Sequence, residues 1–221
     1  MFVHARFGQG DGLALRHTYT GTANSTTFSG TDPDDTQFTL AQAWYQLDAP
    51  LSQRGEHKAV FTVGKIDPFG FFDQNAIADD ETRHFVNNVF VHNPLLDSGG
   101  DIGADRFGFS PGAVAAYENS SDKSMPWGAS LGAFGSGHGA NFSGSSGKAF
   151  VMAQAWIAPR INQLPGTYRA YAWSNARGAD FDGSDARHAG VGMSLDQRFT
   201  DELTLLARYG LRFELIDDAA P

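Results

Sequence analysis

The sequence predicts an all-β fold, an antiparallel up-and-down β-barrel that crosses a membrane with its strands. Glycine and phenylalanine are frequent, with 26 and 18 of the 221 residues, as is typical of β-proteins with many turns and aromatic girdles. Apolar and polar residues alternate over segments of about 10 residues, the length that a tilted strand needs to cross a bilayer. The connections between these segments alternate between long and short, as they do where one barrel end carries loops and the other carries turns.

Alternation with a period of two predicts about nine strands. Near the C-terminal end one face carries Leu203, Leu205, Ala207, Tyr209, Leu211, Phe213 and Leu215. Arg208 and Arg212 fall on the opposite face, and a basic residue facing lipid costs about 2–4 kcal/mol near the midplane, so we expect the polar face to line a lumen. In chain order, the expected strands are 2–8, 36–48, 57–67, 105–118, 126–135, 148–158, 166–175, 188–199 and 203–216.

The connections favour a barrel more strongly than the strands do, because strands of a soluble β-sandwich also alternate. A Greek-key sandwich gives no reason for long and short connections to alternate. The long connections are expected at 9–35, 68–104, 136–147 and 176–187, and the short ones at 49–56, 119–125, 159–165 and 200–202.

The loop at 68–104 is the longest connection, and long loops in compact proteins are usually functional. Within it, the segment 79–92 predicts a short helix, because Asp79 or Asp80 can cap its first turn and Pro94 stops it. The apolar side chains also fit a helix, because Phe85 and Val89, and likewise Val86 and Phe90, form i, i+4 pairs.

Composition narrows the classes of function. The net charge of −9 argues against nucleic acid as a partner, because its phosphates would be repelled. The chain has no cysteine, which excludes disulfides and thiolate metal sites, and its seven histidines show no metal-ligand spacing. The neighbouring carboxylates of Asp79, Asp80 and Glu81 are more typical of a solvated loop than of a catalytic pair. We therefore expect neither enzyme activity nor a cofactor.

A motif lies where an expected strand ends and the longest loop begins. It consists of Gly64-Lys65-Ile66-Asp67-Pro68, Phe72-Asp73-Gln74-Asn75, Asp80-Glu81-Thr82, Phe85-Val86-Asn87 and Phe90-Val91-His92-Asn93-Pro94. These residues resemble the signature of the carbohydrate-selective outer-membrane porins, the OprB-like family. The resemblance implies a barrel of about 16 strands in the outer membrane of a bacterial cell. It also implies passive, carbohydrate-selective diffusion of sugars past the inward-folded loop 68–104, with sugars and outer-membrane lipid as partners of a monomer or homotrimer.

The same resemblance suggests which residues surround the pore. In the loop, the constriction would contain Lys65, Asp67, Asp73, Asn75, Asp80 and Glu81, because charged and amide groups can replace the hydrogen bonds that a sugar makes with water. Two structural alternatives stay open. Lys65 and Asp67 can form an ion pair that ties the loop to the wall, and Asp73 and Asn75 can cap or turn the loop.

On the wall, alternation places Arg169 and Trp173 on the lumen face, in the same way as Arg208 and Arg212. Aromatic rings stack on the apolar faces of sugars, and Trp44 and Trp156 are further candidates for this role. Both can equally be residues of a membrane-interface belt, depending on which face of their strand points outward.

Residues 1–221 are expected to form a single domain that is incomplete at both ends. About nine strands cannot close a barrel of this size, and unpaired strand edges are costly in lipid. Two other functions stay open for the chain. It can be a soluble all-β carbohydrate-binding module, or a truncated porin without function.

Overall fold

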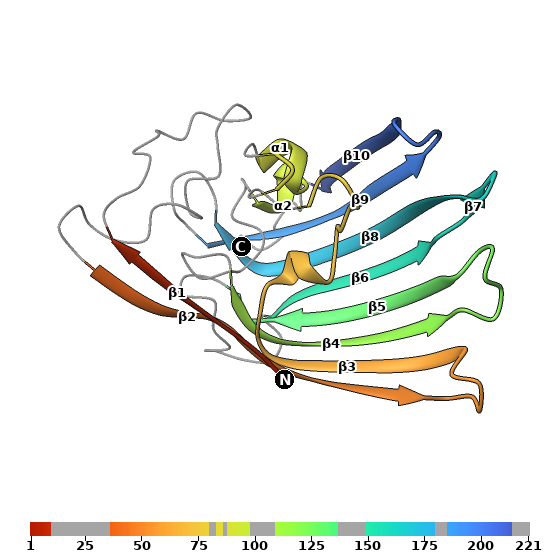
Figure 1. The fold of residues 1–221 in the computed structure, drawn as a ribbon. Coiled ribbons are helices and arrows are strands. Elements are labelled where there is room, and N and C mark those ends of the chain that lie inside the picture. The colour runs from red at the N-terminus through yellow and green to blue at the C-terminus, as the bar shows by residue number, and fades with distance from the viewer. Residues whose placement is uncertain are drawn as a thin grey trace, which may run out of the picture.

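The fold is one antiparallel sheet in which strands that follow one another in sequence lie side by side (Figure 1). The computed structural model describes residues 1–9, 36–79, 83–85, 88–97, 109–136, 149–179 and 185–213. Within them, a 10-stranded sheet has the order β1-β2-β3-β4-β5-β6-β8-β9-β10, and β7 pairs with β8 beside this path. The structure thus has the all-β, up-and-down architecture that the sequence predicts.

Each predicted strand is present, with shifts of a few residues at its ends, because the alternating pattern continues along the paired segments. The unpredicted β7 (Arg160–Ile161) has 2 residues and lies in the connection after β6. The other strands are β1 (Phe2–Gln9), β2 (Thr36–Pro50), β3 (His57–Ile66), β4 (Ser110–Asn119), β5 (Trp127–Phe134), β6 (Phe150–Ile157), β8 (Leu164–Ala179), β9 (Asp185–Arg198) and β10 (Thr204–Phe213).

The predicted alternation of long and short connections holds for most of the chain but not at β8–β9. The predicted loop 176–187 is reduced to residues 180–184, about as short as the turn between β9 and β10 at 199–203. The reason is that β8 and β9 continue to pair as far as Ala179 and Asp185, past an irregularity between Asn175 and Gly178. Both strands are therefore longer than their sequence pattern suggests.

The long connection between β3 and β4 contains three short helical segments in its described parts. These are η2 (Pro68–Gly70), α1 (Asn88–Val91) and α2 (Pro94–Asp97). The predicted helix over 79–92 is wrong in its extent, since only α1 is helical among the described residues of that range. Pro94 begins α2 rather than stopping a helix, because proline lacks an N–H and suits the first helical position. The segments lie on the concave side of the sheet (Figure 1).

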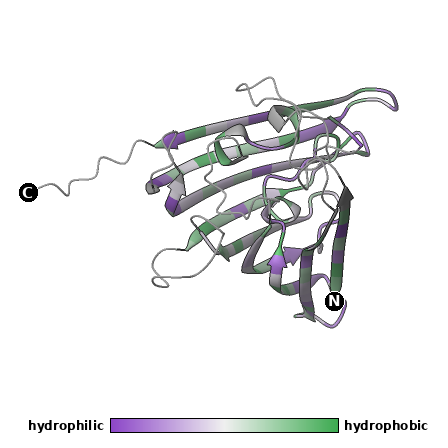
Figure 2. Ribbon diagram, turned by 90° about the vertical axis from the view of Figure 1, so that its left-hand side faces the viewer, coloured by the Kyte–Doolittle hydropathy of each residue, from purple (hydrophilic) through white to green (hydrophobic). Residues whose placement is uncertain are grey.

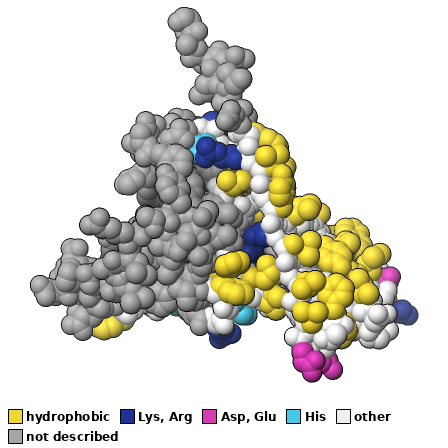
Figure 3. Space-filling model, turned by 90° about the horizontal axis from the view of Figure 1, so that it is seen from above, with side chains coloured by type: hydrophobic (Ala, Val, Ile, Leu, Met, Phe, Trp, Pro, Cys, Tyr) yellow, Lys and Arg dark blue, Asp and Glu magenta, His cyan; other side chains and the backbone are white. Residues whose placement is uncertain are grey.

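The two faces of the sheet differ in chemistry. We call the face toward the β3–β4 connection the inner face and the opposite one the outer face. Along β10, side chains alternate between half-buried and exposed, with Arg208 and Arg212 on the inner face and Leu205, Tyr209 and Leu211 on the outer face, as predicted. Figure 2 shows this alternation along the strands, and Figure 3 shows hydrophobic side chains spread over the exposed sheet. Exposed apolar side chains of the outer face include Phe7, Phe38, Leu47, Phe61, Val63, Leu131, Met193, Leu205, Tyr209 and Leu211.

The hydrophobic core lies between the inner face and the β3–β4 connection. Phe69, Phe72 and Leu96 of the connection are buried there. They pack against side chains of the wall, among them Phe134, Phe150, Met152, Tyr171 and Trp173. Burying one large apolar side chain stabilises a fold by about 1.5–3 kcal/mol, so the connection is held on the sheet by its own core.

The sheet is open in the described part of the chain. β1 and β10 are its two edges and do not pair with each other. The described residues therefore do not form a closed barrel by themselves. No described helix is long and apolar enough to cross a membrane.

Candidate functional site

Arg208 of β10 fixes the β3–β4 connection to the inner face. Its Nε donates to Asp73 Oδ1 over 3.0 Å and its Nη2 donates to the Asp73 carbonyl over 2.9 Å. The same guanidinium donates to the carbonyls of Ala78, at 3.1 Å, and Phe90, at 2.6 Å. One side chain thus binds three separate points of the connection. Because the side chains of Arg208 and Asp73 are only 6% and 0% exposed, this is a buried ion pair.

Asp73 is held by further donors besides Arg208. The Tyr171 hydroxyl donates to its Oδ1 at 2.8 Å and the Asn93 backbone N–H donates to its Oδ2 at 2.6 Å. Burial raises the pKa of Asp73, while Arg208, Tyr171 and Asn93 oppose this by stabilising the ionised form. Asp73 has a φ of 55°, a left-handed conformation that aspartate tolerates better than most residues.

Glycine in the wall makes room for this anchor. A Cβ placed at Gly210 of β10 would lie 2.6 Å from the Asn93 side-chain amide. That amide donates to the Tyr171 hydroxyl at 2.9 Å, so Asn93 reaches the wall only because Gly210 has no side chain. A second anchor is Asn75, whose amide donates to the Leu195 carbonyl at 3.0 Å.

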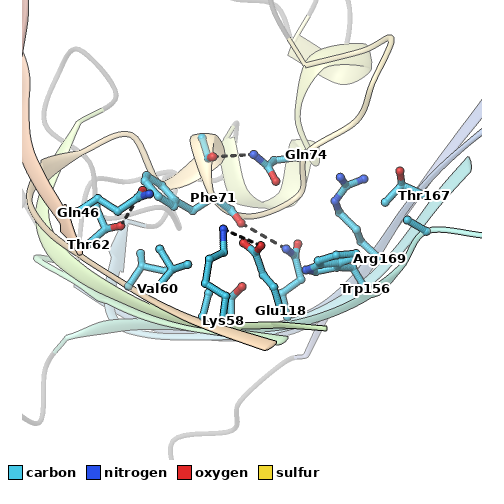
Figure 4. Close-up of a pocket in the computed structure, with 16 residues that line it drawn as sticks. Gln46, Lys58, Val60, Thr62, Phe71, Gln74, Glu118, Trp156, Thr167 and Arg169 are labelled. Carbon is cyan, nitrogen blue, oxygen red and sulfur yellow. Dashed lines mark hydrogen bonds and ion pairs between the residues drawn. The ribbon is translucent and has the colours of Figure 1, made fainter. Parts of the chain in front are cut away.

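Beneath the anchored connection lies a polar cavity of about 360 Å³ on the inner face (Figure 4). Gly70, Phe71 and Gln74 of the connection form its roof. Gln154 of β6 ties this roof to the wall, because it accepts from the Asp73 backbone N–H at 3.0 Å and donates to the Phe71 carbonyl at 3.3 Å. The walls are formed by Gln46, Lys58, Val60, Thr62, Val114, Ala116, Glu118, Ser130, Gln154, Trp156, Ala158, Thr167 and Arg169.

Two cationic side chains line the cavity, and they differ in how many acceptors lie close to them. Lys58 lies 3.0 Å from Glu118 and 3.8 Å from Asp48, so two carboxylates surround its ammonium group. Arg169 has its Nη1 at 3.6 Å from Asp196, which is too long for a hydrogen bond. This Nη1 is buried and has no hydrogen-bond partner among the residues that the structure describes. The Trp156 indole lies between the two cations (Figure 4) and faces Arg169 directly in the β6–β8 register.

Two titratable groups of the connection, the half-buried Asp79 and the buried His92, have strongly shifted pKa values. Burial raises the pKa of Asp79 to about 8, and its Oδ1 has no hydrogen-bond partner among the described residues. Burial also lowers the pKa of His92 to about 3, assisted by the charge of Arg208. The His92 ring stacks on Phe69 with ring centroids 3.8 Å apart. At pH 7 the raised pKa favours the protonated form of Asp79, and the lowered pKa favours the neutral form of His92.

The pKa of Asp79 predicts that stability falls as pH rises. The ordinary value is 3.8 and the folded value is about 8. Between them the folded state binds a proton that the unfolded state does not, so stabilisation present at low pH is lost as the pH rises through 8. The variant Asp79→Asn is expected to remove this loss. Urea unfolding of both proteins at about pH 5 and about pH 9 tests it, and a difference between the proteins that is the same at both pH values contradicts the prediction.

The structure separates the predicted site residues into anchors and cavity residues. Of the predicted set, Arg169 lines the cavity. Asp73, Asn75 and Arg208 hold the connection to the wall. The alternative predicted for Asp73 and Asn75 was that they cap or turn the loop, and Asn75 Oδ1 also accepts from the Ile77 N–H two residues further on. Trp173 is buried in the core, 4% exposed.

Of the remaining predicted residues, those that the structure describes lie outside the cavity. Lys65 donates to the Leu40 carbonyl at 3.0 Å, and the Asp67 side chain accepts from the Phe69 N–H at the start of η2. Arg212 is on the inner face of β10. Asp80 and Glu81 fall outside the described residues.

The site residues predicted from the resemblance of the loop motif did not include Lys58 and Glu118, the charged pair on the wall. Lys58 and Glu118 lie opposite each other in the β3–β4 register, and each keeps the parity of the inner face of its strand. Strand alternation could have placed both residues in a lumen. Trp44 and Trp156 are also inner-face residues. Trp44 packs against Phe71 with ring centroids 6.0 Å apart, and Trp156 lines the cavity.

Chemically, the cavity offers hydrogen-bond donors and acceptors around one aromatic ring, on a wall that a fixed loop covers. Among the residues that the structure describes, no group of His, Asp and Glu could hold a metal ion. No protein-family model, curated protein or solved structure matches the chain.

Proposed function

We propose that the chain forms part of the wall and the constriction of an outer-membrane porin that lets sugars diffuse passively. The observation that carries the proposal is the division of one sheet into two faces. The outer face exposes large apolar side chains, and the inner face carries a charged, polar cavity under an anchored loop. Barrels of bacterial outer membranes have walls of this kind, with one face toward lipid and the other toward water.

The outer face supports contact with lipid. Soluble monomers rarely expose a contiguous apolar patch of more than a few hundred Å², whereas exposed apolar side chains here occur on all the long strands from β1 to β10 except β4 and β8. The central outer positions of those two strands are alanine and tyrosine, namely Ala113, Ala115 and Tyr117 of β4 and Tyr168, Ala170 and Ala172 of β8. Tyr117 and Trp127 pack together beside a short turn, with ring centroids 5.4 Å apart, as an interfacial aromatic girdle would.

The inner face supports passage of a sugar. A sugar needs partners for its hydroxyl groups and an apolar surface for its ring. Lys58, Glu118 and Gln46 supply the first, and Trp156 supplies the second. The cavity of about 360 Å³ is bounded by the wall and by the roof that Asp73 and Arg208 fix in place. This arrangement is a constriction rather than an open lumen.

The direction of the two edge strands limits how many further strands can close the barrel. β1 and β10 run in the same direction, because an even number of antiparallel steps separates them along the path. Direct pairing of these edges would be parallel. Closure with antiparallel pairs needs an odd number of further strands, and edges left unpaired in lipid would cost several kcal/mol per polar group. We therefore propose that the described sheet is one part of a larger barrel, as about 16 strands would provide.

Liposome swelling tests the function. Vesicles that contain the complete barrel of which the chain forms part are expected to swell faster in iso-osmotic glucose than protein-free vesicles, and to discriminate against a trisaccharide of the same osmolarity. Equal swelling with and without the protein contradicts the proposal. A protein that stays folded and monodisperse without detergent contradicts its membrane part and favours a soluble carbohydrate-binding module.

Substitution on the two faces tests which one meets lipid. Leu131 of β5 is on the outer face and 56% exposed, while its neighbour Ser130 is on the inner face. Leu131→Arg is expected to destabilise the protein folded in vesicles by about 2–4 kcal/mol, and Ser130→Arg by clearly less. Urea-dependent folding into lipid vesicles measures both. A Leu131→Arg effect of less than about 0.5 kcal/mol, as at an ordinary exposed site, contradicts lipid contact.

A further inference from the structure

Arg169 is the cavity residue whose bonding is incomplete. Arginine has five N–H donors in a planar fork, yet Arg169 has a single charged neighbour within 4 Å among the described residues, Asp196. The contact is 3.6 Å long, and Asp196 Oδ2 already accepts from the Ala76 backbone N–H at 3.3 Å. The side chain of Arg169 is only 14% exposed, so water replaces the missing acceptors poorly. Nη1, the atom that lies near Asp196, is itself buried, so an acceptor that binds from the cavity meets the guanidinium through its other N–H groups.

The surroundings of Arg169 restrict what that acceptor can be. Trp156 lies beside it across the β6–β8 ladder and presents an aromatic face to the cavity. Thr167, on the same face of β8, and Gln74 of the roof add neutral polar groups (Figure 4). A sugar ring that stacks on Trp156 can therefore place one substituent on the guanidinium.

Charge decides which substituent fits best. Lys58 is already surrounded by Asp48 and Glu118, at 3.8 and 3.0 Å, and is not short of acceptors. Arg169 is the other cation of the cavity, and a planar carboxylate matches its fork with two parallel hydrogen bonds. A phosphate dianion fits less well, because Glu118 lines the same cavity and Asp196 lies behind the guanidinium. A planar group with one negative charge both matches the fork of the guanidinium and limits the repulsion by Glu118 and Asp196.

We propose that this cavity is a subsite for monosaccharides that carry a carboxylate, such as hexuronates, with Arg169 binding the carboxylate and Trp156 stacking on the ring. The inference rests on the proposed function, since it names the class of sugar that the same constriction favours. It makes Arg169 the residue that sets specificity, and leaves Lys58 and Glu118 to bind hydroxyl groups.

Binding in detergent micelles at low salt tests the inference apart from transport. Tryptophan fluorescence is followed while glucuronate, glucose or acetate is added. The wild-type protein is expected to bind glucuronate at least tenfold more tightly than glucose, and acetate more weakly than glucuronate. Arg169→Gln is expected to abolish this preference, and Arg169→Lys to retain part of it, because lysine keeps the charge and loses the fork. Arg160→Gln, at an exposed residue of β7 outside the cavity lining, is the matched control and is expected to keep the full preference.

The outcomes separate the two proposals. Equal affinity of the wild-type protein for glucuronate and glucose overturns the subsite, and so does a preference that survives in Arg169→Gln. Either result can occur while vesicles still swell in glucose, which leaves the porin proposal standing. Acetate binding as tight as glucuronate binding also overturns the subsite, because it shows a carboxylate site without a sugar. The wild-type comparison decides the matter even where a variant does not fold.

Discussion

Replacing Arg208 with methionine is expected to cost about 3–5 kcal/mol of folding stability and to release the β3–β4 connection from the wall. The reason is that Asp73 is 0% exposed and loses its charged partner, while the carbonyls of Ala78 and Phe90 lose their donor. Methionine keeps much of the apolar volume of the arginine stem, so the effect reports the lost charge and hydrogen bonds. Urea unfolding in detergent measures the stability change.

A matched ion pair provides the control for Arg208. Arg198 lies 2.9 Å from Asp201, but their side chains are 39% and 88% exposed. Surface pairs contribute about 0–1 kcal/mol, so Arg198→Met is expected to change stability by no more than that. In planar bilayers, Arg208→Met is also expected to raise the single-channel conductance, since the roof of the cavity is no longer fixed. An effect of Arg208→Met as small as that of Arg198→Met shows that the anchor is not what holds the connection.

Replacing Gly64 with alanine is expected to be the second most damaging change, at about 3 kcal/mol or more. Gly64 has a φ of 147° in β3, a conformation that side chains rarely adopt. A Cβ there would lie 2.2 Å from the Ala43 carbonyl oxygen and 2.6 Å from the Trp44 Cα. Both contacts are with the backbone of β2, which cannot move aside without breaking the pairing.

Gly55, in the turn between β2 and β3, separates the conformational cost from the steric one. It has a φ of 69°, and nothing lies within 4 Å of its added Cβ. Gly55→Ala is therefore expected to cost only the conformational penalty, about 1–2 kcal/mol. Thermal unfolding of both variants in the same detergent compares them, and equal losses of stability contradict a steric role for Gly64.

The sequence motif lies where the chain leaves β3 and enters the connection that covers the cavity, and the structure gives the physical reason. Gly64 lets β3 approach β2 closely at its end, and Asp67 begins η2 by accepting from the Phe69 N–H at 3.0 Å. The motif therefore encodes how the chain leaves the wall and turns inward. Its described charged residues, Lys65, Asp67 and Asp73, do not line the cavity, so the motif indicated the roof and not the residues under it.

The helix over 79–92 could not be predicted correctly from local pattern. The backbone in this part of the connection follows contacts with distant strands, since Arg208 binds the carbonyls of Ala78 and Phe90 from 130 and 118 residues away in sequence. Carbonyls that are bound from outside do not need helical hydrogen bonds. Tertiary contacts therefore override the helical spacing of the apolar residues.

The sequence by itself determined the strands, their up-and-down order and the chemistry of each face, because a period of two is a local property that every strand carries. Only the tertiary structure decided which inner-face residues meet. The Asp73–Arg208 pair spans 135 residues, and the cavity combines strands β2 to β8 with the connection that covers them. Such contacts depend on the register of every strand pair and on the path of the loop. The alternation within a single strand predicts neither the register nor the path of the loop.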